Sequence, residues 1–176
     1  MDAAGSDNPP IPDERTTLTA YLEAQRQVLA WKCRGLSDAQ LKTRAVPPSR
    51  LSLLGLVRHM AEVERFWFRR GLMAEKIGSL WNSPENRRAA FEEIEDADVA
   101  AAFAAWEEEC QRARAILRDL PSLEEGFMDA HGWPCSARDM VNHMIEEYSR
   151  HNGHADLLRE CLDGATGDFP PPEESD

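Results

Sequence analysis

The stretch HMIEEYSRHNGHADLLRE, residues 143–160, decides how the fold is interpreted, because it has helical period and carries three of the chain's five histidines. An α-helix turns by about 100° per residue, so side chains three or four positions apart share a face. Glu147 and His151 therefore lie on the same face as a stripe of apolar and aromatic residues: Met140, Met144, Tyr148, Ala155, Leu158 and Leu162. A carboxylate on a buried face needs a partner, because an uncompensated buried charge is costly.

The same period recurs in three earlier segments, and no alternating strand pattern accompanies it. The first helix is predicted from a cap at Thr16 or Thr17 to about Gly35, the second from 49–52 to about 74, and the third over 96–118. The fourth begins at Ser136 and ends near 162, where Gly164 is the expected stop. Four amphipathic helices without strands predict an all-α fold, a four-helix bundle.

The ends of the chain have a different composition. Residues 1–13 and the acidic residues 164–176 are rich in Pro, Gly, Asp and Glu and are predicted to be disordered tails around one domain, residues 14–163. The formal charge of −12 argues against nucleic-acid binding, and no apolar run has the length of a membrane span. We expect a cytoplasmic protein whose four scattered cysteines, without a CxxC pair, are mostly small buried side chains.

A metal site is one explanation for the polar residues on the buried face. Glu147 and His151 are four residues apart, so both would reach one ion from a single helix. His59 is the only histidine of the second helix and lies on its apolar side between Val63 and Phe66. Two histidines and one glutamate leave a coordination position open, as in catalytic zinc sites. The alternative is that each of the three is a satisfied polar group of the core.

This ligand set does not determine which metal would bind. Two imidazoles and a carboxylate suit zinc, which we place first, and also nickel, iron or manganese. Glu62 follows His59 by three residues, but a di-iron centre is not favoured, because the pattern occurs once and in reversed order.

Two stretches, LSLLGLVRHMAEVERFWF (51–68) and MVNHMIEEYSRHNGHADLLRE (140–160), resemble the DinB-like four-helix-bundle metalloprotein superfamily. Within it the chain is most similar to the mini-circle protein group and is related to mycothiol-dependent maleylpyruvate isomerase; the resemblance covers about residues 15–162. It implies an up-down-down-up topology, a homodimer and a metal triad of His59, Glu147 and His151.

The resemblance also implies a chemistry. Related proteins use a divalent metal to activate a low-molecular-weight thiol such as mycothiol or bacillithiol, so we expect a thiol S-transferase or isomerase acting on a small electrophile. His154 would border the pocket, because related sequences often hold Gln there. Four arginines, Arg58, Arg65, Arg69 and Arg70, would bind carboxylates of the thiol cofactor at the end of the bundle, with Arg58 placed first, or would belong to a solvated surface.

Three alternatives remain open at this point: a non-catalytic metal- or small-molecule-binding bundle with a sensory role, a metal-dependent hydrolase, and a relative that binds no metal. A fourth protein ligand would favour the structural role, and a water in that position would favour catalysis.

Overall fold

The structure is a computed structural model that describes residues 11–129 and 132–167. The helical elements are α1 (Glu14–Cys33), α2 (Asp38–Lys42), α3 (Leu53–Glu64), the π-helix η1 (Arg65–Leu72), α4 (Ala89–Glu92), α5 (Val99–Asp119) and α6 (Ala137–Asp163). The strands are β1 (Gly126–Met128) and β2 (Pro134–Ser136). The all-α class is therefore confirmed. Of the tails predicted to be disordered, residues 1–10 and 168–176 lie outside the described residues.

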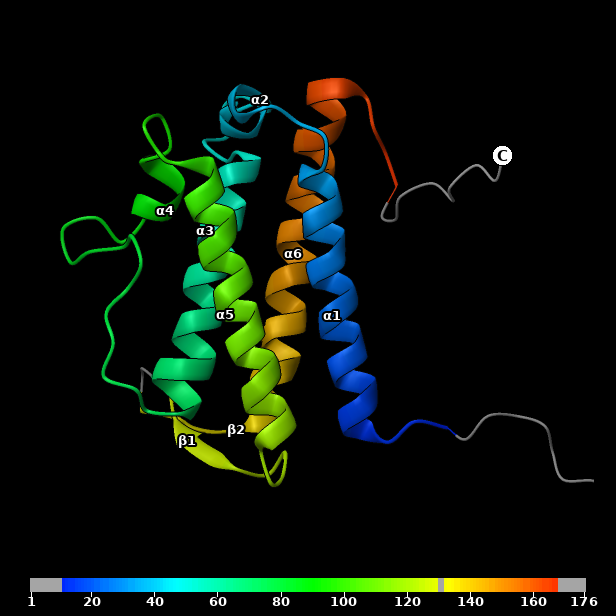
Figure 1. The fold of residues 1–176 in the computed structure, drawn as a ribbon, viewed down its shortest axis with the longest axis vertical. Coiled ribbons are helices and arrows are strands. Elements are labelled where there is room, and N and C mark those ends of the chain that lie inside the picture. The colour runs from blue at the N-terminus through cyan, green and yellow to red at the C-terminus, as the bar shows by residue number, and fades with distance from the viewer. Residues whose placement is uncertain (1–10, 130–131, 168–176) are drawn as a thin grey trace, which may run out of the picture.

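The long helices pack in pairs, α1 with α6 and α3 with α5, and α3 also contacts α6 (Figure 1). Their facing sides bury an apolar core that includes Leu22, Leu56, Met60, Met144 and Leu158. The α3–α6 contact places the second-helix histidine beside the histidine-rich stretch. The exact up-down-down-up order stays a prediction. Among the described residues, no helix has an apolar stretch long enough to cross a bilayer.

The helix ends follow local capping chemistry. Ser52, Asp98 and Ser136 accept hydrogen bonds from backbone N–H groups in the first turns of α3, α5 and α6. Gly164 follows α6 with a φ of 78°, the left-handed conformation expected of a stop glycine. The predicted start of α1 is wrong by one turn, because the Asp13 carboxylate caps the helix and Thr16 donates its N–H to it at 2.8 Å.

The expectation that the chain forms no strands is also wrong. β1 and β2 pair antiparallel, with Phe127 opposite Cys135, in the connection between α5 and α6. Three-residue strands are too short to show an alternating pattern in sequence. The hairpin brings Phe127 against η1, where the Trp67 and Phe127 ring centroids are 6.4 Å apart. This contact closes one end of a groove that runs along η1.

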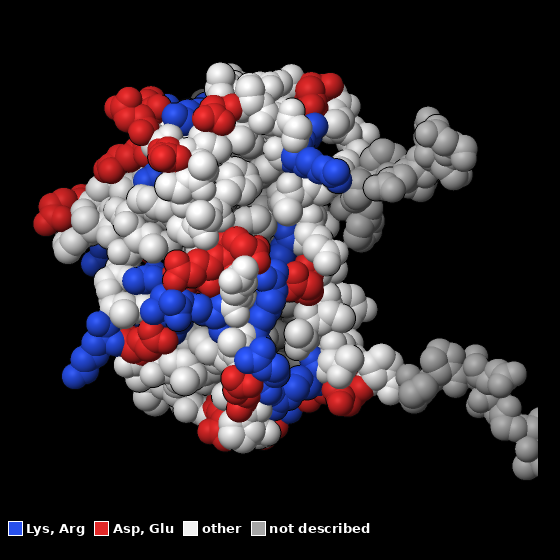
Figure 2. Space-filling view, in the orientation of Figure 1, with Lys and Arg blue, Asp and Glu red and all other residues white. Residues whose placement is uncertain are grey.

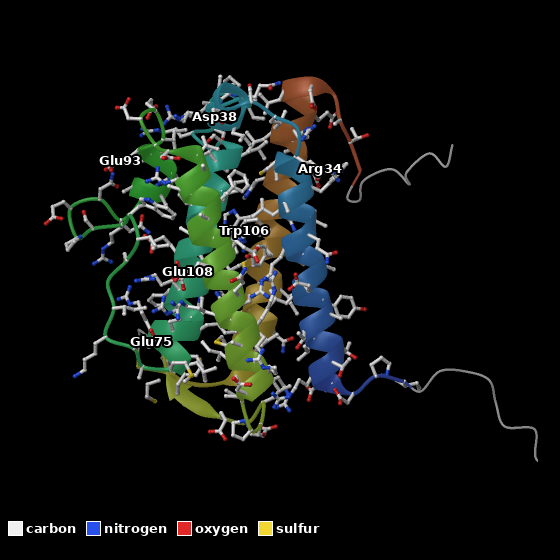
Figure 3. All side chains as sticks on the ribbon, in the orientation of Figure 1. Arg34, Asp38, Glu75, Glu93, Trp106 and Glu108 are labelled. Atoms are coloured by element: carbon white, nitrogen blue, oxygen red, sulfur yellow. The ribbon has the colours of Figure 1, made fainter. Side chains whose placement is uncertain are left out.

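A hydrogen-bonded cluster lies in the middle of the bundle and joins all four long helices. Glu64 of α3 is fully buried and receives two 2.8 Å hydrogen bonds from Arg26 of α1. Tyr148 of α6 donates to Glu64 at 2.8 Å, and Trp106 of α5 donates to Tyr148 at 2.9 Å. Figure 3 labels Trp106 in the upper, N-terminal half of α5. The cluster fixes how the helices face one another.

We predict that Glu64→Ala lowers the free energy of unfolding by about 3–5 kcal/mol, because it leaves the buried Arg26 guanidinium without its carboxylate. Urea unfolding followed by circular dichroism measures this change. Glu108→Ala, at an exposed α5 position marked in Figure 3, is the matched control and should change stability by less than about 1 kcal/mol. The double variant Arg26→Met/Glu64→Leu should recover part of the loss. Equal, small effects of Glu64→Ala and Glu108→Ala would contradict the assigned role.

Candidate metal centre

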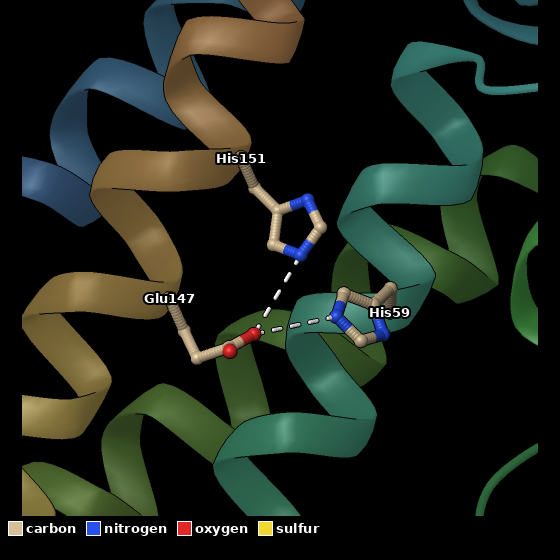
Figure 4. Close-up of side chains that lie close together, drawn as sticks. All are labelled: His59, Glu147 and His151. Atoms are coloured by element: carbon tan, nitrogen blue, oxygen red, sulfur yellow. Dashed lines mark ion pairs between the residues drawn. The ribbon is translucent and has the colours of Figure 1, made fainter. Parts of the chain in front are cut away.

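Three ligand-type side chains converge between α3 and α6. His59 projects from α3, and Glu147 and His151 project from successive turns of α6 (Figure 4). Glu147 Oε2 is 3.8 Å from His59 Nε2 and 3.6 Å from His151 Nε2. One ligand atom from each residue lies within 4.8 Å of the other two. The structure thus brings together the three residues that the sequence selected, which we call the triad.

The triad lies at the edge of the core and not at its centre. His151 is 8% exposed, whereas His59 and Glu147 are half-buried. Interaction with His59 is the main cause that holds the pKa of the Glu147 carboxyl below its ordinary value, against the opposing effect of burial. Burial, aided by His59 and opposed by Glu147, lowers the pKa of His151 to about 4. At neutral pH the site therefore contains a carboxylate and a neutral His151 imidazole, the protonation states that a metal ligand needs.

Aromatic rings surround the His59 imidazole. Its centroid lies 4.5 Å from the Phe91 ring and 4.6 Å from the His151 ring. Phe91 belongs to the short helix α4, which packs against α3. These contacts restrict the directions in which the His59 ring can turn, so Nε2 stays directed toward Glu147.

Two more histidines of α6 adjoin the triad. His143 Nε2 is 3.9 Å from Glu147 Oε1, and the His143 ring lies 4.7 Å from Trp67. His154 Nδ1 is 3.3 Å from His151 Nδ1, so one of these nitrogens donates a hydrogen bond to the other. This bond leaves His151 Nε2 free to face Glu147. The closeness of His143 was missed from the sequence, although its position four residues before Glu147 was the available signal.

The other residues singled out from the sequence have different surroundings. Arg58 is buried, donates to the Glu93 carbonyl and stacks on Trp81 at 4.8 Å, and it lines a cavity of about 550 Å³ between α4 and α5 that His59 does not line. Glu62 accepts hydrogen bonds from the backbone N–H groups of Trp81 and Asn82 at 2.6 and 2.9 Å. Glu62 thus anchors a loop, consistent with leaving it out of a metal site.

The triad residues fit a divalent ion. Tetrahedral zinc with N and O ligands at about 2.0–2.2 Å separates those ligands by roughly 3.3 Å. The two Glu147–histidine separations of 3.6 and 3.8 Å exceed that value by a few tenths of an ångström, and the ligand nitrogens of His59 and His151 lie within 4.8 Å of each other. To hold one ion, the two imidazoles would have to turn toward each other. The chemistry of the donors, two imidazoles and one carboxylate, also matches zinc.

Two of the chain's own thiols are poorly suited to act as nucleophiles. Cys33 and Cys110 are buried, and burial raises the pKa of Cys33 to about 12 and also raises the pKa of Cys110. Cys161 is exposed near the end of α6, and Cys135 lies in β2. None of the four belongs to the group of residues that could hold a metal. A thiol reaction at the triad would thus need a thiol from outside the chain.

Comparison with known proteins gives one match. The family model described as mycothiol-S-transferase matches residues 17–164, which is most of the chain. No curated protein and no solved structure matches.

We predict that iodoacetamide at pH 8 alkylates Cys161 readily in the native protein and leaves Cys33 and Cys110 unmodified. A thiol reacts as its thiolate, and the raised pKa values keep the two buried thiols protonated at this pH. Peptide mass spectrometry after timed labelling measures each site, and labelling in urea provides the control in which all four react. Native labelling of Cys33 at the rate of Cys161 would contradict the burial described here.

Proposed function

The chain belongs to the mycothiol-S-transferase family, and we propose that it is a metal-dependent enzyme that transfers mycothiol, or a similar low-molecular-weight thiol, to a small electrophile. The observation that carries the proposal is the convergence of His59, Glu147 and His151 within 4.8 Å, at the edge of the core. A ligand set of three side chains leaves one position for an exogenous ligand. We propose zinc first, with nickel, iron or manganese as alternatives.

The thiol is the group to be activated. A divalent ion held by the triad would lower the pKa of a thiol beside it, so that the thiolate exists at neutral pH. The thiol proton leaves to solvent, the sulfur forms a bond to the electrophilic carbon, and the leaving group departs with the electrons of the broken bond. If the electrophile is an alkene, the carbon next to the attacked one takes up a proton. Rotation about the resulting single bond, followed by loss of that proton and of the thiol, would give isomerisation.

The chain's own residues hold the reacting groups in place. Glu147 supplies the negative charge of the ligand set, and His154 orients the His151 ring through the hydrogen bond between their Nδ1 atoms. We propose that His154 also borders the thiol site. Arg58 stays a predicted cofactor-binding residue, to be tested by thiol titration of Arg58→Gln. Homodimer formation likewise stays a prediction.

We predict that His59→Ala, Glu147→Ala and His151→Ala each lower zinc affinity at least about tenfold and thiol transfer at least about 100-fold. Elemental analysis of untagged protein measures bound metal, and conjugation of mycothiol to 1-chloro-2,4-dinitrobenzene, with release of chloride, measures transfer. Glu146→Ala is the matched control, since Glu146 adjoins Glu147 on α6 but is exposed and should leave both quantities unchanged. Full metal content in the three triad variants, or transfer that survives chelation, would refute the proposal.

A non-catalytic metal site is the second candidate, and the position of His143 favours it. His143 Nε2 is 3.9 Å from the second Glu147 oxygen and would close the ligand set if it turned toward the ion. For the catalytic role we expect His143→Gln to keep its zinc, with affinity changed less than about threefold, because His143 is no ligand. Zinc titration measures the affinity. A loss as large as in the triad variants, together with absent thiol transfer in the unaltered protein, would establish the structural role.

A further inference from the structure

A groove leads away from His59 along one side of α3 and η1. Its first part, of about 270 Å³, is lined by His59, Glu62, Val63, Phe66, Trp67, Arg70, Ser79 and Asn82. Its second part, of about 360 Å³, continues toward the hairpin and shares Phe66, Trp67 and Arg70 with the first. We call the two parts together the His59 groove. The first part is lined by His59 of the triad and the second by Phe127 of the hairpin, and the rings of Phe66 and Trp67 border both.

Arg70 lies where the two parts of the groove meet, and it differs from its neighbours in η1. Arg65 and Arg69 both pair with Glu109, and Arg69 also pairs with Glu75. Within the described residues Arg70 forms no ion pair with a carboxylate. It stacks on Phe66 at 5.4 Å and makes a long hydrogen bond of 3.4 Å to Ser79 Oγ. On the face of the molecule shown in Figure 2, acidic and basic side chains lie close together. Among the residues that the structure describes, the exposed Arg70 guanidinium has no acidic partner, although the chain has a net charge of −12.

The loop that follows η1 forms another wall of the groove and supplies further hydrogen-bond donors. Asn82 Oδ1 accepts from the Ala90 N–H at 3.1 Å, which fixes the amide and leaves Nδ2 as a donor without a partner in the described part of the chain. Ser79 Oγ accepts from Arg70, so its hydroxyl proton is free to be donated. Glu62 holds this wall in place through the N–H groups of Trp81 and Asn82. A guanidinium, a hydroxyl and an amide therefore border the His59 groove.

We propose that the His59 groove binds an electrophile with an apolar body and a single carboxylate, and that Arg70 binds the carboxylate. A guanidinium matches the planar carboxylate with two parallel N–H donors. Glu62, Glu75, Asp129 and the cationic Lys76 also line the groove, and the three acidic charges disfavour a phosphate dianion more than a monoanion. The aromatic rings of Phe66, Trp67 and Phe127 fit the apolar body. This proposal rests on the proposed function, since it names the substrate class for the same site.

The test measures binding without turnover. Isothermal titration calorimetry is performed with 3-phenylpropionate, its neutral amide and inorganic phosphate as probes, on the full chain with zinc and again after chelation. A carboxylate could also ligate the ion, and the chelated sample removes that contribution. We expect 3-phenylpropionate to bind both samples at least about tenfold more tightly than the amide or phosphate.

Variants then assign the binding to Arg70. Arg70→Gln should weaken 3-phenylpropionate binding at least about tenfold and leave amide binding unchanged, and Arg70→Lys should restore part of the loss. Arg87→Gln is the matched control, because Arg87 is exposed and lines neither part of the groove. Equal binding to Arg70→Gln, or binding that disappears on chelation, would overturn the proposal. If the metal-binding test of the triad fails but 3-phenylpropionate binding still depends on Arg70, only the proposed function is refuted.

Discussion

One buried carboxylate determines how the helices of this protein face one another. Glu64 is fully buried on α3, and its charge is tolerated because Arg26 donates two hydrogen bonds and Tyr148 donates a third. A pair of this kind is seldom a large net source of stability, but a rearranged helix packing that separated the partners would leave an unpaired charge in the core. The interaction therefore selects one arrangement of α1, α3 and α6, and the Trp106 hydrogen bond to Tyr148 adds α5.

The candidate metal centre depends on that arrangement. His59 precedes Glu64 on α3 by somewhat more than one helical turn, and Glu147 immediately precedes Tyr148 on α6, so the Glu64–Tyr148 bond fixes the two helices next to the triad. Adjacent residues of a helix point about 100° apart, so Tyr148 enters the core while Glu147 faces His59 at the core's edge. Packing of the core thus sets the position of the triad, and the triad's own contacts do not. A set of metal ligands needs such support if it is to be in place before the ion binds.

Much of this could be read from the sequence, because helical period is a strong signal over long segments. The apolar stripe of residues 140–158 identified Glu147 and His151 as polar residues on a buried face, and the same reasoning selected His59. The hairpin could not be found this way, since three-residue strands have too few positions to alternate. The partners of Glu64 could not be predicted either, because the sequence of an amphipathic helix does not show which arginine pairs with a single acidic residue on it. The π-helix η1 changes the angle between successive residues, so an α-helical wheel cannot decide which of Arg65, Arg69 and Arg70 stays unpaired.

The π-helix also places the groove beside the triad. η1 continues α3 without a break, so core residues and residues that line the groove lie along one continuous helix. Phe68 of η1 is fully buried, whereas Phe66, Trp67 and Arg70 line the groove. The hairpin packs against η1. In the proposed reaction the thiol and its electrophile both come from outside the chain, and the groove gives a substrate access to His59. Because His59 is held by a helix of the core, reactants bound there would meet in one orientation at a fixed site, as bimolecular chemistry requires.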